Sequence, residues 1–123
     1  YLTMKNDNLI HVKSKQFAIR IINTFKYLQT EKKEFVLSKQ MLRSGTAIGA
    51  LIKESEFAQS RKDCLNKLYI ALKEANETQY WIERLFETEY ITKMEFDSLS
   101  TDCLEILKLL VAITKKLKES LGN

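Results

Sequence analysis

The sequence contains no proline and only three glycines in 123 residues. A chain of this length carries about six prolines at average usage, and proline breaks helix interiors because it lacks an N–H donor. Long apolar runs are missing too, since LKLLVAI at 107–113 is among the longest. A membrane-spanning helix needs about 20 apolar residues. These absences favour an all-α protein that has no transmembrane segment.

Histidine is also scarce, which limits the possible chemistry. His11 is the single histidine, so the Glu-x-x-His pairs that hold metal in helical bundles are absent. The sequence has no glycine-rich phosphate loop and no nucleophile elbow. We therefore predict no enzymatic activity, with no catalytic residues, no metal site and no cofactor.

The remaining composition is that of a globular protein, with 45% hydrophobic and 29% charged residues. Its length fits a single domain over residues 1–123. The N-terminus YLTMKNDN is polar and lacks a signal-peptide core, so cytoplasm is the expected location. Without secretion, Cys64 and Cys103 are expected as reduced thiols on apolar helix faces.

Apolar residues spaced three and four apart predict four helices. The expected ranges are 8–29, 35–57, 60–87 and 93–119. The last helix has an unbroken seam of Phe96, Leu99, Cys103, Ile106, Leu110, Ile113 and Leu117. Ser60 with Asp63, and Thr92 with Glu95, have the spacing of helix-capping pairs. Since short connections make successive helices antiparallel, the sequence predicts an up-down-up-down four-helix bundle.

More apolar surface is present than one bundle needs. The additional residues are Tyr69, Tyr80 and Trp81 in the third helix, and Leu104, Leu107, Leu109 and Val111 in the fourth. A second buried face of this kind favours a homo-oligomer over a monomer with a wide core. The aromatic residues have two interpretations, which are subunit contacts, assigned to Tyr80 and Trp81, or stacking on nucleic-acid bases.

Gly45 and Gly49 lie four residues apart inside the second helix. Each costs about 1 kcal/mol relative to alanine in a helix interior, so some interaction must offset that cost. A pair on one face lets another helix approach closely, which predicts a tight crossing within the bundle or at a subunit contact. The alternatives are a smooth backbone surface that admits a phosphate, and a kink in the helix.

The formal net charge of +4 permits a nucleic-acid partner. Candidate phosphate-binding residues in the second and third helices are Lys39, Arg43, Lys53, Arg61, Lys62 and Lys67. Lys115, Lys116 and Lys118 form a further basic group near the C-terminus. Acidic residues Glu54, Glu74 and Glu77 lie among them and are expected to pair with Arg43, Lys73 or Arg84. The alternative function is a protein-interaction scaffold that binds no nucleic acid.

Three stretches carry a family resemblance, namely SKQMLRSGTAIGALIKES, QSRKDCLNKLYIALKEANETQYWIERL and TEYI. They resemble the bacterial four-helix-bundle family that includes proteins encoded by intervening sequences in large-subunit rRNA genes. The same family includes accessory variability proteins of diversity-generating retroelements. The matching positions are Gln40, Arg43, Ser44, Ile48, Gly49, Ala50, Ile52, Glu54, Ser60, Arg61, Lys62, Asp63, Ala71, Glu74, Ala75, Glu77, Tyr80 and Trp81. The resemblance spans roughly residues 16–92.

This resemblance implies an antiparallel four-helix bundle that assembles as a ring-shaped homopentamer. The retroelement members act beside a reverse transcriptase and bind nucleic acid through basic surface. The implied partners are therefore further copies of this chain, RNA or DNA, and a reverse transcriptase. Leu51 stands where the family usually has asparagine. If that asparagine has a role in the family, such as a hydrogen bond across a subunit contact, this chain lacks it.

Overall fold

The computed structural model describes residues 4–122, and within that range it contains four helices and no strand. The elements are α1 (Met4–Thr30), α2 (Leu37–Ser55), α3 (Arg61–Glu87) and α4 (Lys93–Gly122). The predicted helices are confirmed, although α1 begins earlier and α2 is shorter at both ends than the apolar pattern indicated. Residues 1–3 and 123 of the expected single domain lie outside the described range.

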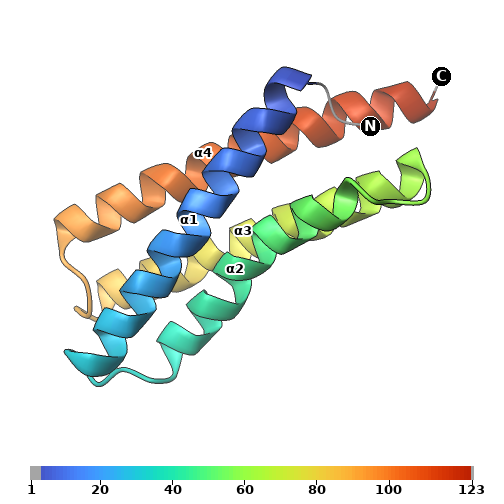
Figure 1. Ribbon diagram of the computed structural model, residues 1–123. Helices are drawn as coiled ribbons and strands as arrows, with labels where there is room; N and C mark the ends of the chain where they lie inside the picture. The colour runs from blue at the N-terminus through green and yellow to red at the C-terminus, as the bar shows by residue number, and fades with distance from the viewer. Residues whose placement is uncertain (1–3, 123) are drawn as a thin grey trace.

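The helices run back and forth in an up-down-up-down arrangement (Figure 1). Each packs against its neighbours in a closed order, since α1 contacts α2 and α4, and α3 also contacts α2 and α4. The α2–α3 connection therefore lies at the same end of the bundle as the C-terminal part of α4 (Figure 1). The α1–α2 and α3–α4 connections lie at the opposite end. Among residues 4–122, no helix is long and apolar enough to cross a membrane.

The predicted seam of α4 is confirmed. All its members except the half-buried Phe96 are buried, namely Leu99, Cys103, Ile106, Leu110, Ile113 and Leu117. Cys64 is buried as well, as expected for a core cysteine. Burial, followed by the nearby charges of Asp102 and Glu83, raises the pKa of the Cys103 thiol to about 12. Since the thiolate is the reactive form, this cysteine packs in the core and does not act as a nucleophile.

Both predicted capping pairs are confirmed. Ser60 Oγ accepts the Asp63 N–H at 3.0 Å at the start of α3. At the start of α4, Glu95 N–H donates to Thr92 Oγ1 at 3.2 Å, and Thr92 N–H donates to Glu95 Oε1 at 2.8 Å. Each pair satisfies backbone donors that have no partner within the helix.

The start of α2 is capped differently. Glu34 is only 6% exposed, and its carboxylate accepts the N–H groups of Val36, Leu37 and Ser38 at 3.1, 3.0 and 2.6 Å. Burial by itself raises the pKa of Glu34. The hydrogen bonds from the backbone donors, led by Ser38, lower the pKa by more than burial raises it, so the pKa lies below its usual value. The left-handed backbone at Lys33, with φ of 54°, immediately precedes this carboxylate.

Replacing Glu34 by glutamine is expected to lower the free energy of unfolding by about 1–2 kcal/mol at pH 7, because charged hydrogen bonds to three backbone donors weaken. Because the pKa of Glu34 is lower in the folded state, its ionised carboxylate stabilises the protein at pH values above the unfolded pKa of about 4.3. That stabilisation is lost as the pH falls through the folded pKa. The difference between wild type and variant should therefore shrink in acid. Urea titrations between pH 3 and pH 7 measure this, with the exposed Glu31→Gln as the matched control. An undiminished difference at pH 3 would exclude the charge as its source.

The two glycines of α2 face α1. A Cβ added at Gly45 would lie 2.9 Å from Cγ2 of Ile21, so no side chain fits there without displacing a buried isoleucine. A Cβ at Gly49 would lie 3.5 Å from the backbone oxygen of Ser14, which is an ordinary contact. Gly45 therefore lies in close contact with α1, and Gly49 is less tightly packed.

Candidate nucleic-acid interface

One end of the bundle collects basic side chains from three helices. The register of α3 against α4 is set by Gln79 Nε2, which donates to Ser100 Oγ at 3.1 Å, and by Cys103 Sγ, which donates to the Ala75 oxygen at 3.4 Å. Continuing this antiparallel register places Lys116 level with Lys62. We call this region the basic end, and it comprises Lys53, Arg61, Lys62, Lys67, Lys115, Lys116 and Lys118.

Four of the six predicted phosphate-binding residues lie at the basic end, namely Lys53, Arg61, Lys62 and Lys67. Lys39 does not, because it lies in the first turn of α2, 14 residues before Lys53. At 1.5 Å per residue, that separation is about 21 Å along the helix. Lys39 is exposed at the opposite end of the molecule.

Arg43, the sixth predicted residue, is engaged by carboxylates of α3. Its Nη1 lies 3.2 Å from Glu74 Oε2, and its Nη2 donates to Glu77 Oε2. The indole N–H of Trp81 donates to the same Glu77 oxygen at 3.0 Å. The Trp81 donor, followed by Arg43, lowers the pKa of Glu77. The predicted pairing of Arg43 with Glu74 and Glu77 is confirmed, and it offsets part of the negative charge of α3.

Lys53 and Lys67 line a surface hollow of about 330 Å³ together with the exposed ring of Phe57. Lys67 Nζ lies 3.8 Å from Glu54 Oε1, so Glu54 pairs with a lysine that the sequence did not suggest. Lys53 Nζ lies 3.6 Å from Glu56 Oε2. Exposed ion pairs of this kind contribute about 0–1 kcal/mol, so a phosphate can displace the carboxylates at little cost.

Arg61 and Lys62 differ from Lys53 and Lys67 because their charges are not engaged in ion pairs within the described residues. Both are exposed at the start of α3. Among the acidic groups near them, Asp63 accepts the Gln59 N–H at 3.2 Å as part of the helix cap. These two cations are therefore available to an external anion.

The family model for the 23S rRNA-intervening sequence protein matches residues 6–112 of this chain. The chain belongs to that family. A search of the curated proteins finds no match. The identification confirms the family resemblance of the sequence, and the matched span covers most of all four helices.

A solved structure supports this membership. It is described as a protein with unknown function from the S23 ribosomal protein family of Bacteroides thetaiotaomicron. It is 59% identical to this intervening-sequence family protein, with a TM-score of 0.88, and the match covers 89% of this chain and 98% of that one. The intervening-sequence family model ends before Lys115, Lys116 and Lys118, so the lysines that α4 adds to the basic end lie beyond the matched span.

Charge is unevenly distributed along α4. Its acidic residues Glu95, Asp97, Asp102 and Glu105 all precede its basic residues Lys108, Lys115, Lys116 and Lys118, and only Lys93 and Glu119 depart from this order. The helix dipole acts over the last turn, and the last turn of α4 contains no basic residue. Dipole stabilisation therefore does not account for the lysines.

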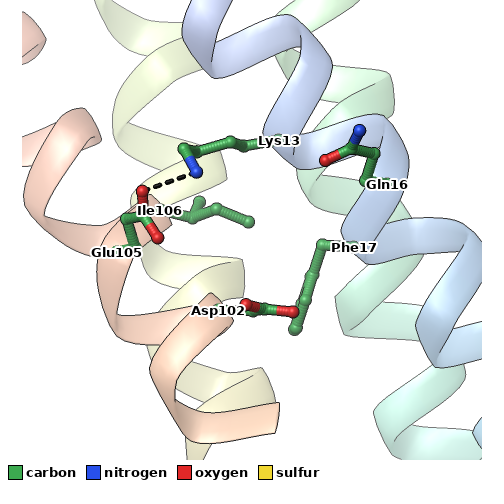
Figure 2. A pocket seen from close by; sticks show the side chains of 6 residues that line it. All are labelled: Lys13, Gln16, Phe17, Asp102, Glu105 and Ile106. Carbon is green, nitrogen blue, oxygen red and sulfur yellow. Dashed lines mark ion pairs between the residues drawn. The ribbon is translucent and has the colours of Figure 1, made fainter. Parts of the chain in front are cut away.

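Two other hollows lie beside α1. Figure 2 shows a cleft of about 50 Å³ that is lined by Lys13, Gln16, Phe17, Asp102, Glu105 and Ile106. Lys13 Nζ lies 2.6 Å from Glu105 Oε1 across it, and this volume holds about one or two waters. His11 Nε2 lies 2.7 Å from Glu56 Oε1 on the far side of α1. Within residues 4–122, no three His, Cys, Asp or Glu side chains converge as a metal site.

Proposed function

We propose that this intervening-sequence family protein is a non-enzymatic, cytoplasmic homo-oligomer that binds RNA or DNA through the basic end. The observation that carries the proposal is the convergence of exposed cations from α2, α3 and α4, of which Arg61 and Lys62 have no partner within the described chain. Phosphate neutralisation by such cations releases counterions, which supplies most of the affinity of non-specific nucleic-acid binding.

Oligomerisation is supported by two separate apolar surfaces. One is the α1 stripe of exposed Leu9, Val12, Ile19 and Ile22, and the other is the α4 stripe of exposed Leu104 and Val111. A ring requires contacts between two different patches of neighbouring subunits. We assign these stripes to that contact, in the ring-shaped homopentamer that the family resemblance implies. Five copies of a weak basic end then act together with the avidity of one strong site.

Gly45 and Trp81 have packing partners within the protomer. Gly45 packs on Ile21, and Trp81 is half-buried against the core. Tyr80 remains exposed, with its ring 5.0 Å from that of Trp81 between centroids. The prediction that Gly45, Gly49, Tyr80 and Trp81 make subunit contacts stays a prediction, and the apolar stripes offer a larger surface for that role.

The oligomer is tested by light scattering on the double variant Leu104→Lys/Val111→Lys. We expect the wild type to have a molar mass that is a multiple of the 14.4 kDa monomer mass, and the variant to have the monomer mass itself. The reason is that a charge in an apolar contact is costly to desolvate. Met94→Lys, at an exposed residue outside both stripes, is the matched control and should keep the wild-type mass. Wild type at 14.4 kDa, or an unchanged double variant, would contradict the assignment.

Nucleic-acid binding is tested by gel shifts against mixed RNA and DNA at two ionic strengths. Because the basic end contacts several phosphates in this proposal, we expect the affinity for nucleic acid to fall by about tenfold or more between about 50 and 200 mM salt. The second candidate function is a protein-interaction scaffold, which the two exposed apolar stripes favour. A scaffold would retain its protein partner with little salt dependence and would leave the nucleic acids unshifted.

A further inference from the structure

The outward face of α3 carries an ordered series of polar and aromatic side chains. Its members are Lys62, Asn66, Tyr69, Lys73, Asn76 and Tyr80, and every one is exposed. They are spaced four, three, four, three and four residues apart, which keeps them on one face of the helix. The order lysine, asparagine, tyrosine occurs twice. We call these residues the α3 stripe.

The two tyrosines are placed alike. Tyr69 and Tyr80 are 39% and 48% exposed, and the 11 residues between them make close to three full turns. Their rise along the axis is therefore about 16 Å. Lys62 and Lys73 are separated by the same 11 residues. Each ring thus has a lysine seven residues before it on the same face.

Carboxylates next to the stripe are engaged in ion pairs with two arginines. Glu74 and Glu77 lie on the side of α3 that faces α2, where Arg43 pairs with both. Beyond Tyr80, Arg84 Nε lies 2.8 Å from Glu87 Oε1, and its guanidinium carbon lies 4.5 Å from the centre of the Tyr80 ring. The stripe itself contains two lysines and no acidic residue, and the carboxylates beside it are paired with Arg43 and Arg84.

We infer that the α3 stripe binds single-stranded nucleic acid. In this arrangement the lysines contact phosphates, the tyrosine rings stack on unpaired bases, and the asparagine amides hydrogen-bond to base edges. The inference rests on the proposed function and specifies its substrate class. A duplex keeps its bases stacked inside and away from side-chain rings, so it uses only the lysines. The separation of the rings matches about five stacked nucleotides at 3.4 Å each.

A subunit contact fits the stripe less well. The cores of protein interfaces are depleted in lysine, and here Lys73 lies between the two tyrosines on the same face. Trp81, the other candidate for stacking, is half-buried and donates its indole N–H to Glu77. Tyr69 and Tyr80 are the more exposed rings. Arg84 lies over the Tyr80 ring at 4.5 Å, so a base stacks there on the opposite face or displaces the guanidinium.

The test compares fluorescence anisotropy of labelled single-stranded RNA, single-stranded DNA and the corresponding duplex. For the double variant Tyr69→Ala/Tyr80→Ala we expect single-strand affinity to fall about tenfold to a hundredfold, as loss of base stacking does elsewhere. Duplex affinity should be unchanged. Tyr69→Phe/Tyr80→Phe keeps both rings and should bind as wild type. Tyr27→Ala, at an exposed tyrosine of α1, is the matched control.

Each other outcome overturns the inference in a recognisable way. Equal wild-type affinity for single strand and duplex, or an unchanged alanine variant, leaves basic-end binding intact but refutes base stacking. An altered oligomer mass with unaltered affinity identifies the stripe as a subunit contact. Absence of binding to all three probes refutes the proposed function and the inference together. Comparison of the affinities for single-stranded RNA and single-stranded DNA identifies which nucleic acid is the ligand.

Discussion

Replacing Gly45 by alanine is expected to lower the free energy of unfolding by about 1–2 kcal/mol, whereas Gly49→Ala should raise it by up to about 1 kcal/mol. Both changes gain the same helix propensity, about 1 kcal/mol relative to glycine. They differ in what the added methyl group meets. The opposite signs follow from the crossing of α1 over α2.

At Gly45 the methyl group would lie 2.9 Å from Cγ2 and 3.0 Å from Cγ1 of Ile21. Ile21 is fully buried and branched at Cβ, so it has little freedom to move away. Overpacking of this kind costs about 1–3 kcal/mol, which exceeds the gain in propensity. At Gly49 the nearest atom is the Ser14 oxygen at 3.5 Å, so the gain in propensity is retained.

Urea denaturation of the two alanine variants measures the effect at equal protein concentration. Gly45→Leu extends the comparison, because a leucine at that crossing is expected to separate α1 from α2 and abolish cooperative unfolding. Helix content by circular dichroism distinguishes misfolding from loss of assembly. Stabilisation by Gly45→Ala would refute the tight crossing, and destabilisation by Gly49→Ala would assign that glycine a contact outside the protomer.

The charge-reversal variant Arg61→Glu/Lys62→Glu is expected to weaken nucleic-acid binding by about tenfold or more at moderate salt, and to lower the salt slope by about two. Both residues are exposed cations without a partner in the described chain. Reversal removes two phosphate contacts and adds repulsion. Negative charge at the N-terminus of a helix is favourable, so the fold should not suffer.

The matched control reverses two exposed lysines at the opposite end, as Lys26→Glu/Lys32→Glu. It changes the net charge by the same amount, so it separates local contact from long-range attraction. Fluorescence anisotropy titrations at several salt concentrations give affinity and slope for each variant. If both variants lose affinity equally, binding depends on net charge alone and the basic end has no special role.

The helices were predictable because their apolar spacing is the physical cause of their packing. The seam of α4 and the cap at Ser60 follow from local rules that act within a few residues. The cap of α2 escaped those rules because Val36 occupies the N-cap and has no side-chain acceptor. Glu34, two residues earlier, supplies the acceptor instead, directly after the left-handed backbone at Lys33.

The candidate site was predictable only in part, because it depends on how helices align. The sequence suggested that Arg43 pairs with carboxylates, and it lies opposite Glu74 and Glu77 of α3. The pair between Lys67 and Glu54 was not predicted, because it depends on how α2 and α3 align. Lys116 comes level with Lys62 only through the register of α4 on α3. Lys62, Tyr69 and Tyr80 of the α3 stripe were among the predicted nucleic-acid contacts, but Asn66, Lys73 and Asn76 were not, because polar residues interrupt the apolar pattern that predicts the helix. The regular three-and-four spacing of the α3 stripe was the available signal.

The claim that one end of the bundle holds nucleic acid is tested most directly by a lysine footprint. The protein is acetylated with and without single-stranded RNA, and the modified lysines are identified by mass spectrometry. We expect protection at Lys53, Lys62, Lys67, Lys115, Lys116 and Lys118, and unchanged reactivity at Lys26, Lys32 and Lys39. Protection at the latter three, or unchanged reactivity throughout the basic end, would contradict the claim.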